Sequence, residues 1–283
     1  MNYLSRYYQF HKILAKRIIA HALSRVRNIK IYCLFFNLRA LLYRVDTKVI
    51  WIRDIGVFKV SQANLSNYFF NRRYGSFEYA DGLENRCRRI GETYFLDHIE
   101  FNEKDLVVDC GANVGDLYLY FKINNINISY IAYEPSVNEY KCLALNTLDR
   151  ENAESFNMAL WYETKSIEFF VSSDGADSSI IEPYLFDERV KVSAFRLDEL
   201  LHKRKKIKLF KLEAEGAEIE VLQGSLSILK NIEFISADLG FERGVQQDST
   251  LVPVTSFHYE NGFEMITMSH DRIVALFKNK NFE

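Results

Sequence analysis

The sequence predicts an α/β protein with a doubly wound, mostly parallel sheet, and two observations lead to this prediction. From residue 83 onward, short apolar runs typical of strands alternate with longer amphipathic runs typical of helices. Such alternation produces strand–helix–strand units with parallel strands. In addition, one apolar run ends in an acid at Asp109 and is followed by a glycine-spaced turn. An open α/β sheet holds a nucleotide-like ligand with this arrangement.

Between residues 46 and 104, the chain is expected to contain a short hairpin and two helices. Two apolar runs flank the pair Asp54-Ile55, which predicts an antiparallel hairpin. Two later stretches have helical apolar spacing, and the second leads into the first strand of the core. The predicted elements are the hairpin strands 49–53 and 56–60 and the helices 62–73 and 83–98.

The core from residue 105 onward is expected to alternate strands and helices and to end in an antiparallel hairpin. An irregular stretch with two strand-like segments interrupts the alternation after the third strand. The predicted strands are 105–110, 129–133, 154–160, 166–171, 190–195, 207–212, 232–239, 264–268 and 272–277. The predicted helices are one that follows the first strand to about residue 124, and the helices 136–149 and 217–229.

Basic residues are concentrated at the N-terminal end of the chain. Residues 1–45 contain nine Lys and Arg and no Asp or Glu, whereas the rest of the chain holds 27 bases against 38 acids. The same arm is rich in aromatic and aliphatic residues, but its longest apolar run, Ile31–Phe36, is far too short to span a bilayer. We therefore expect two domains: a basic, aromatic-rich, mainly helical extension over 1–82 that includes the short hairpin, and a core domain over 83–283.

The basic arm is interpreted as two amphipathic helices, for which two roles are open. They pack on the core domain or on a second copy of the chain, as in a homodimer, or they lie on an anionic membrane surface. Nucleic-acid binding is not expected, because no basic patch occurs elsewhere. The four cysteines form no CxxC pair, which indicates free thiols in a reducing compartment. The expected location is the cytoplasm, with peripheral contact at the inner membrane face in the alternative in which the arm lies on a membrane.

The most informative motif runs from Asp105 to Asp116. Gly111 and Gly115 allow the backbone to approach a ligand and to adopt positive φ angles, and the helix that follows begins with free amide groups. The spacing is Gly-x-Asn-x-Gly rather than Gly-x-Gly-x-x-Gly, so a pyrophosphate-binding dinucleotide loop fits poorly. On spacing alone, these glycines either serve a ligand or serve only the geometry of the turn.

Two further strand ends carry acids. The segment Tyr130–Pro135 includes Glu134, 19 residues beyond Gly115, where a carboxylate either accepts both hydroxyls of a ribose or caps the following helix. The segment Ile207–Glu218 runs from a strand into a loop crowded with acids. An amphipathic helix follows it, with one apolar face formed by Val221, Leu222, Leu226 and Leu229.

These three segments, in this order and spacing, resemble the FkbM-family methyltransferases, a branch of the S-adenosylmethionine-dependent class. The family pattern is Asp-x-Gly-Ala-Asn-x-Gly, then a strand-end Glu-Pro, then Lys-(Ile/Leu)-(Asp/Glu)-x-Glu-Gly-Ala-Glu and Val-Leu-x-Gly. This chain supplies the pattern with Asp109–Gly115, Glu134-Pro135, Lys211–Glu218 and Val221–Gly224. The likeness covers about residues 85–279. It departs from the family at Glu213, where Asp is commoner, and at Phe241, where Pro is often found.

The resemblance implies a Rossmann-like, seven-stranded class I methyltransferase fold with the last strand pair antiparallel, and S-adenosyl-L-methionine as the cofactor. It implies that Asp109 and Gly111 hold the methionine end, that Glu134 accepts the ribose hydroxyls, and that residues 157–159 border the adenine. The expected cofactor-binding residues are Asp109, Gly111, Ala112, Asn113, Gly115, Asp116, Glu134, Pro135, Asn157, Met158, Ala159, Asp177, Ser178 and Ser179.

The implied chemistry is methyl transfer to a hydroxyl, which requires alignment of donor and acceptor and a base. Glu213 is expected to line the methyl site, with Glu215 either the base or a ligand of the acceptor hydroxyl. Alternatively, Glu215 caps the helix that opens at Gly216. Asp238 is a third candidate catalytic residue, and Glu242 is a further candidate near the acceptor. No metal ion is expected in the site.

The expected function is therefore that of an S-adenosylmethionine-dependent O-methyltransferase. Its expected acceptor is a sugar hydroxyl of a bacterial surface glycan, such as a polysaccharide or lipopolysaccharide, or of a lipid-linked precursor. The acceptor class rests on family analogy. Two alternatives stay open, namely O-methylation of a polyketide-like or other secondary metabolite, and a non-catalytic binding or scaffold protein that retains the fold.

Overall fold

The structure is a computed structural model that describes residues 25–73, 78–148, 151–172, 178–201, 206–269 and 272–282. Its contacts divide the chain into two units, Met1–Arg86 and Cys87–Glu283. The division falls inside helix α3 (Leu83–Thr93), whose first residue directly follows the boundary that the sequence predicts between residues 82 and 83. No helix among the described residues is both long and apolar enough to cross a membrane.

The described part of the first unit is built from helix α2, packed on a three-stranded antiparallel sheet, and from the first residues of α3. Helix α2 (Ile29–Tyr43) begins after Asn28, whose side-chain oxygen accepts hydrogen bonds from the first backbone amides of the helix. Tyr32 and Phe36 are buried, and the Tyr32 ring lies 5.1 Å from that of Phe58 in the sheet. The strands are β1 (Thr47–Ile52), β2 (Val57–Gln62) and β3 (Tyr68–Phe70), in that order.

The hairpin predicted around Asp54-Ile55 is confirmed, because β1 and β2 pair antiparallel up to Ile52 and Val57. The helix predicted over residues 62–73 is wrong, because residues 68–70 form β3 and pair with β2. The aromatic side chains of Tyr68 and Phe70 alternate with Phe69, so that both are buried, and Phe70 stacks on Phe58 at 5.1 Å. The described part of the extension is thus not mainly helical. The helix predicted nearest the N-terminus lies outside the described residues.

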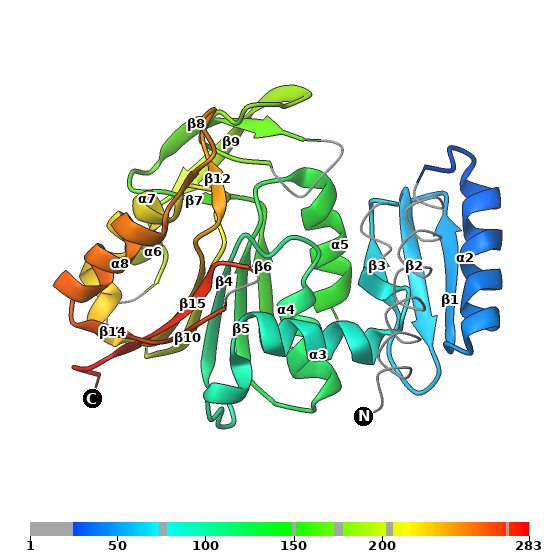
Figure 1. Cartoon of the computed structure of the whole chain (residues 1–283), viewed down its shortest axis with the longest axis horizontal. Coiled ribbons are helices and arrows are strands. Elements are labelled where there is room, and N and C mark those ends of the chain that lie inside the picture. Colours follow the sequence, from blue (N-terminus) through cyan, green and yellow to red (C-terminus); the bar gives the residue numbers. More distant parts are fainter. Residues whose placement is uncertain are drawn as a thin grey trace, which may run out of the picture. The chain divides into compact units, whose positions relative to one another are not determined.

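The second unit is built around a seven-stranded sheet in the order β14-β15-β11-β10-β4-β5-β6 (Figure 1). The five strands β6, β5, β4, β10 and β11 run parallel, whereas β15 is antiparallel to both of its neighbours. The predicted α/β class with a final antiparallel pair is therefore confirmed. The strand bounds are β4 Leu106–Cys110, β5 Ser129–Tyr133, β6 Ala153–Phe156, β10 Ile207–Leu212, β11 Ile232–Asp238, β14 Phe263–Met268 and β15 Val274–Asn279.

Helices cover both faces of this sheet, because alternate residues of each buried strand point to opposite sides (Figure 1). Val108 and Phe210 belong to one apolar cluster, which includes side chains from α6 (Leu197–Leu200), α7 (Glu218–Gln223) and α8 (Leu251–Glu260). Val107 and Leu209 belong to a second cluster, which includes side chains from α3, α4 (Asp116–Ile123) and α5 (Val137–Thr147).

Three predicted elements are interrupted in the structure. The predicted helix 83–98 ends at Thr93, because Phe95 adopts a left-handed conformation before the short 3-10 helix η2 (Leu96–His98). The predicted helix 217–229 divides at Gly224, where the chain approaches the backbone of Trp161, and continues as the 3-10 helix η3 (Leu226–Asn231). The predicted strand 154–160 divides after Phe156.

The second unit also contains two small sheets, whose first strands follow strands of the main sheet along the chain. The strands β7 (Ala159–Leu160), β9 (Glu188–Phe195) and β8 (Lys165–Val171) form a three-stranded sheet in that order. The short strands β12 (Phe241–Arg243) and β13 (Asp248–Ser249) pair antiparallel after β11. Both small sheets follow strands of the main sheet directly, so they can place side chains near the carboxyl ends of those strands.

Candidate functional site

The candidate site lies where the strand order of the main sheet reverses. The chain proceeds from β4 to β5 on one side, and β10 and β11 lie on the other side of β4. In open α/β sheets, ligands bind at the carboxyl ends of the strands at this point. The loops after β4 and β10 meet there so closely that a Cβ atom on Gly111, which has a φ of +68°, would lie 1.9 Å from the Glu213 carbonyl oxygen. Glycine at 111 is therefore required by both the conformation and the close approach.

The turn after β4 holds the carboxylate at the end of β5. The backbone amide of Asn113 donates a hydrogen bond to Glu134 Oε2 at 2.8 Å, and that of Ser136 donates to Oε1 at 2.8 Å. Asn113 and Gly115 have positive φ angles of 51° and 94°, which turn the chain into helix α4. Burial raises the pKa of Glu134 to about 7, although both of these hydrogen bonds lower it. The structure thus brings together Gly111, Asn113, Gly115 and Glu134, as the motif predicts.

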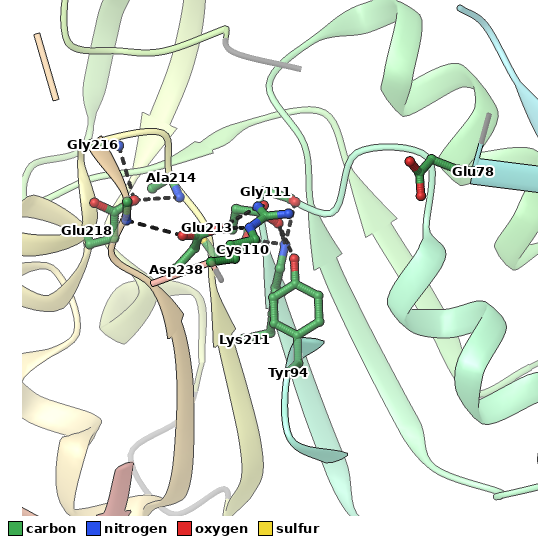
Figure 2. Close-up of polar contacts among 12 residues, drawn as sticks. Glu78, Tyr94, Cys110, Gly111, Lys211, Glu213, Ala214, Gly216, Glu218 and Asp238 are labelled. Carbon is green, nitrogen blue, oxygen red and sulfur yellow. Dashed lines mark hydrogen bonds and ion pairs between the residues drawn. The ribbon is translucent and has the colours of Figure 1, made fainter. Parts of the chain in front are cut away.

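Lys211 is the centre of a buried charge cluster at the ends of β4 and β10 (Figure 2). It lies opposite Asp109 in the parallel pairing of these strands. Its ammonium lies 2.9 Å from Glu213 Oε2 and 3.1 Å from Asp109 Oδ1, and it donates to the carbonyl oxygens of Cys110 and Gly111 at 3.1 and 2.7 Å. Burial alone would lower its pKa, but the two carboxylates outweigh burial and raise the pKa well above its ordinary value.

Glu213 is held by three donors. Its carboxylate accepts hydrogen bonds from the Tyr94 hydroxyl at 2.6 Å, from Lys211 and from Arg272. Burial raises the pKa of Glu213, but the charges of Lys211 and Arg272 outweigh burial and lower it to about 2. A carboxylate that is ionised and saturated in this way is a poor proton acceptor. Its expected place beside the methyl site stays a prediction.

Asp109 and Asp238 are both buried, and their carboxylates contact other side chains of the protein. Asp109 is 0% exposed, accepts a hydrogen bond from the Tyr130 hydroxyl and pairs with Lys211. The contact expected between Asp109 and the cofactor stays a prediction, and its observed contacts are with Tyr130 and Lys211. Asp238 is 1% exposed and pairs with Arg272. The catalytic role expected of Asp238 stays a prediction, and its observed contact is with Arg272.

The Glu218 side chain holds the loop after β10 through hydrogen bonds to its backbone. Glu218 Oε1 accepts hydrogen bonds from the backbone amides of Ala214 and Gly216 at 3.0 and 3.1 Å (Figure 2). Helix α7 begins at Glu218 with Ala217 as its N-cap residue, and the alternative in which Glu215 caps this helix stays a prediction. Glu215 instead adopts a left-handed φ of 48° and lines a pocket. Its position beside a pocket suits contact with an acceptor.

The three residues expected at the adenine do not share one strand: Asn157 and Met158 follow β6, and Ala159 begins β7. Asn157 donates from its side chain to the carbonyl oxygens of Glu134 and Pro135, both at 2.9 Å, and so ties the end of β6 to that of β5. Met158 packs against the main apolar cluster. Ala159 is buried in β7, which pairs with β9 outside the main sheet, so the expectation that all three residues end the third strand is wrong.

The serine loop predicted near the cofactor contacts the loop after β10. The Ser179 hydroxyl donates to the Glu215 carbonyl oxygen at 2.6 Å, and Ser178 accepts a hydrogen bond from the Ser172 amide. Asp177 lies outside the described residues. The contact of Ser179 with Glu215 joins this loop to the acid-rich loop rather than to the glycine turn.

A pocket of about 570 Å³ opens beside these loops, a volume within the range of about 300–1,000 Å³ typical of small-molecule sites. Its described lining residues are Ser172, Pro183, Tyr184, Leu185, Phe186, Asp187, Glu215, Phe241, Glu242, Gly244 and Gln247. Burial, followed by the nearby charges of Asp238 and Glu213, raises the pKa of Glu242 to about 8. Among the described residues, the Glu242 carboxylate has no hydrogen bond or ion pair.

Sequence reasoning missed Lys211, Tyr94 and Arg272 as members of the site. Lys211 was recognisable from the sequence, because a lysine in a strand buried on both faces needs a partner for its charge. Tyr94 and Arg272 gave none, because they lie 119 and 59 positions from Glu213 in sequence. The described residues contain no group of three or more His, Cys, Asp or Glu suited to holding a metal ion.

The donor set at the switch point fits a nucleoside that carries a positive charge. Each oxygen of Glu134 accepts one backbone amide, which leaves lone-pair capacity on both oxygens for two hydroxyls of a ribose. Asp109, Glu213 and Asp238 are opposed within the described cluster by two cations, Lys211 and Arg272, so the surroundings favour a further positive group. Fold and site together define a Rossmann-like protein in which the ends of β4, β5 and β10 carry groups suited to a cationic nucleoside.

The family follows from comparison with known protein families. The model of the methyltransferase FkbM domain matches residues 109–283, and the chain belongs to this family. It is therefore a methyltransferase, and S-adenosylmethionine is its cofactor. The residues matched include the whole glycine turn, Glu134 and the loop after β10.

Other comparisons are more distant. A search of curated proteins finds no match. Among solved structures, the N-terminal domain of human METTL16 in complex with SAH has a TM-score of 0.41 at 12% identity, covering 71% of this chain and 70% of that one. An rRNA methylase from Streptococcus thermophilus has a TM-score of 0.39 at 12% identity, covering 68% and 93%. A protein of the NADB-Rossmann superfamily from Streptococcus agalactiae has a TM-score of 0.40 at 9% identity, covering 70% and 69%.

Proposed function

We propose that this methyltransferase modifies oxygen, transferring a methyl group to a sugar hydroxyl of a surface glycan or of its lipid-linked precursor. The observation that supports this proposal is the Glu242 carboxylate, which lines the pocket beside the loop after β10 and has no partner among the described residues. A hydroxyl acceptor needs such a base, because its proton must leave as the oxygen gains a methyl group.

The residues around the proposed reacting centre have separate roles. When bound, S-adenosylmethionine supplies a methyl group that is already activated by its sulfonium. Glu134 and the glycine turn hold the ribose end, while Lys211 and Arg272 fix the ionised Glu213 at the end of β10. Glu242 takes the proton of the acceptor hydroxyl. Its carboxylate lies close to that of Asp238, since a Cβ atom on Gly240 would lie 3.3 Å from Glu242 Oε1 and 3.4 Å from Asp238 Oδ1.

Substitution of Glu242 tests the proposed base. We expect Glu242→Gln to lower kcat by about 10²–10⁴, the usual contribution of a positioned base, and to leave the cofactor dissociation constant unchanged in calorimetry. In the unchanged protein, kcat should rise as pH increases through about 8, because Glu242 accepts a proton only when ionised. This rise should disappear in the variant.

Two controls accompany this experiment. Glu264→Gln changes an exposed carboxylate on β14 and should leave kcat unchanged. Glu242→Gln should fold at least as well as the unchanged protein above pH 8. The folded-state pKa of Glu242 is raised, so its ionisation destabilises the fold as pH rises. Full turnover by a correctly folded Glu242→Gln variant would show that Glu242 is not the base.

The acceptor class is tested with labelled cofactor. Incorporation of label into extracted surface polysaccharide, but not into a panel of small aromatic and polyketide-like hydroxyl compounds, supports the glycan acceptor. The reverse result favours a secondary metabolite. Cofactor binding without incorporation into either class favours a non-catalytic protein that retains the fold.

We further propose that helix α2 lies on an anionic membrane surface, where a lipid-linked glycan precursor is located. The face of α2 opposite the sheet exposes a stripe of large apolar side chains, Ile31, Leu34, Phe35, Leu38, Leu41 and Leu42. Exposed cations flank the helix at Arg25, Arg27, Lys30, Arg44 and Lys48. An apolar stripe flanked by cations is typical of helices that lie in the membrane interface.

A further inference from the structure

The Glu242 side chain is carried by an irregularity in the small sheet of β12 and β13. Phe241 pairs with Ser249 and Arg243 pairs with Asp248, so Glu242 is an extra residue between two paired ones. A β-bulge of this kind redirects a side chain, and bulges are frequent beside active sites. Here the extra residue lines the pocket. Because the extra residue of a bulge is left unpaired, the direction of Glu242 depends on the contacts of its neighbours.

Arg243 joins this irregular strand to helix α7. Its guanidinium donates to both oxygens of Glu220, from Nη1 at 2.9 Å and from Nη2 at 2.7 Å. Nη1 also donates to the Gly216 carbonyl oxygen at 2.5 Å. Paired hydrogen bonds between a guanidinium and a carboxylate are strong and fix direction as well as distance. The side chains of Arg243 and Glu220 are only 34% and 14% exposed, so water competes little for these bonds.

The backbones of β12 and of the loop after β10 are also in direct contact. A Cβ atom on Gly216 would lie 2.5 Å from Arg243 Cα and 2.9 Å from the Arg243 backbone nitrogen. At the base of the hairpin, the Ser249 hydroxyl donates to the Leu239 carbonyl oxygen at 2.7 Å, which joins β13 to the residue after β11. The hairpin is therefore fixed at its base by Ser249 and against the loop after β10 by Arg243.

We propose that Arg243 is a positioning residue for methyl transfer, which holds the bulge of β12 through Glu220 and the Gly216 carbonyl so that Glu242 faces the pocket. Arg243 acts through Glu242 and contacts neither the acceptor nor the cofactor. Without its guanidinium, the bulge is free to turn Glu242 toward solvent. This inference rests on the proposed function, in which Glu242 takes the proton of the acceptor hydroxyl.

Turnover with labelled S-adenosylmethionine and extracted surface polysaccharide tests the effect on transfer. We expect Arg243→Met to lower kcat by about 100-fold, a loss that displacement of a reacting group by about 1 Å can cause. The dissociation constant of the cofactor should be unchanged in calorimetry. Arg243→Lys keeps the charge but loses the paired hydrogen bonds, so it should recover only part of the loss.

Arg196 provides a matched control for Arg243. It binds both oxygens of Asp198 at 3.0 and 2.8 Å, donates to the Tyr162 carbonyl oxygen at 3.0 Å, and has a side chain that is 32% exposed. It thus repeats the contacts of Arg243, but it is not among the described residues that line the pocket. Arg196→Met should leave kcat unchanged. Equal losses in the two arginine variants, or no loss in Arg243→Met, would overturn the proposal.

The pKa of Glu242 tests the position of this side chain without turnover. Burial is the largest cause of its raised pKa of about 8, so turning the side chain toward solvent should lower the pKa toward its ordinary value of 4.5. Loss of the positive charge of Arg243 without movement would instead raise the pKa. We therefore expect a lower pKa in Arg243→Met, measured by carbon-13 NMR titration with the Glu242 signal assigned by its absence from Glu242→Gln. An unchanged or higher pKa would contradict a positioning role.

The proposed function and the role of Arg243 fail in different ways. If Glu242 is not the base, Glu242→Gln keeps full turnover, whatever Arg243→Met does. If only the role of Arg243 is wrong, Glu242→Gln loses turnover, whereas Arg243→Met keeps both kcat and the pKa of Glu242. If both are right, adding Arg243→Met to Glu242→Gln lowers kcat no further.

Discussion

Lys211 neutralises the buried carboxylates at the ends of β4 and β10. Its ammonium pairs with Asp109 and Glu213, and the Asp109 side chain has no exposed surface. Removal of one partner from a buried ion pair leaves an uncompensated charge in a medium that solvates it poorly. The same lysine also donates to the carbonyl oxygens of Cys110 and Gly111, so it connects the charge cluster to the glycine turn after β4.

Replacement of Lys211 should therefore destabilise the protein strongly. We expect Lys211→Met to lower the free energy of unfolding by about 3–5 kcal/mol, the usual result of breaking a buried pair, and to weaken cofactor binding. The measurement is urea unfolding followed by circular dichroism, with calorimetry for the cofactor. Lys208→Met is the control on the same strand, because Lys208 makes a single ion pair with Glu233 nearer the surface. Equal losses in both variants would contradict the central role of Lys211.

At the scale of elements, the turns after the strands determine whether the site forms. The loops after β4 and β10 pack against each other at Gly111, and the loop after β10 packs against β12 at Gly216. A Cβ atom on Gly216 would lie 2.5 Å from Arg243 Cα. These contacts involve backbone atoms, so the loops cannot relax by moving a side chain. The position of each strand end therefore depends on its neighbour.

An alanine at position 111 should separate the loops after β4 and β10. We expect Gly111→Ala to abolish measurable cofactor binding and to lower the melting temperature more than Gly56→Ala does. Gly56 is a matched control, since its φ of +67° is almost the same but a Cβ atom there would have nothing within 4 Å. Differential scanning fluorimetry and calorimetry measure both effects. Similar losses in the two variants would assign the effect to left-handed backbone strain alone.

Most elements of the core were predictable, and the failures have physical causes. Strand 207–212 has the predicted bounds, because an apolar run between turn residues is a local signal. The helix predicted over 62–73 was wrong because Tyr68 and Phe70 are buried together through pairing with β2, which local spacing does not report. The strand predicted over 154–160 divides because Ala159 and Leu160 pair with Ala194 and Phe195 of β9, which lie far along the chain.

At the scale of the whole molecule, the N-terminal arm and the rest of the chain carry net charges of opposite sign. Residues 1–45 carry nine bases and no acids, whereas the rest carries a net charge of −11. An anionic membrane attracts the first part and repels the second, so electrostatics alone would orient the protein with its N-terminal arm toward the lipid. In the proposed contact, the exposed leucines of α2 would supply the apolar part.

Vesicle binding tests this orientation. The protein should co-sediment with phosphatidylglycerol vesicles but not with phosphatidylcholine vesicles, and salt should weaken binding because it screens the charges. Replacing Leu41 and Leu42, which are 74% and 71% exposed, with serine should reduce binding. Leu148→Ser, at a 79% exposed leucine outside the arm, should not. Equal binding to both lipids would rule out the anionic surface.

The sequence by itself determined the α/β class, the succession of strands along the chain and the glycine turn, because these depend on local periodicity and on residues a few positions apart. Only the tertiary structure decided which strand ends meet. It placed Lys211 opposite Asp109 and brought Tyr94 and Arg272 to Glu213. It also placed Glu242 at a pocket, where its carboxylate has no hydrogen bond or ion pair with the residues that the structure describes. Such contacts join residues far apart in the chain, and they form only when the sheet assembles.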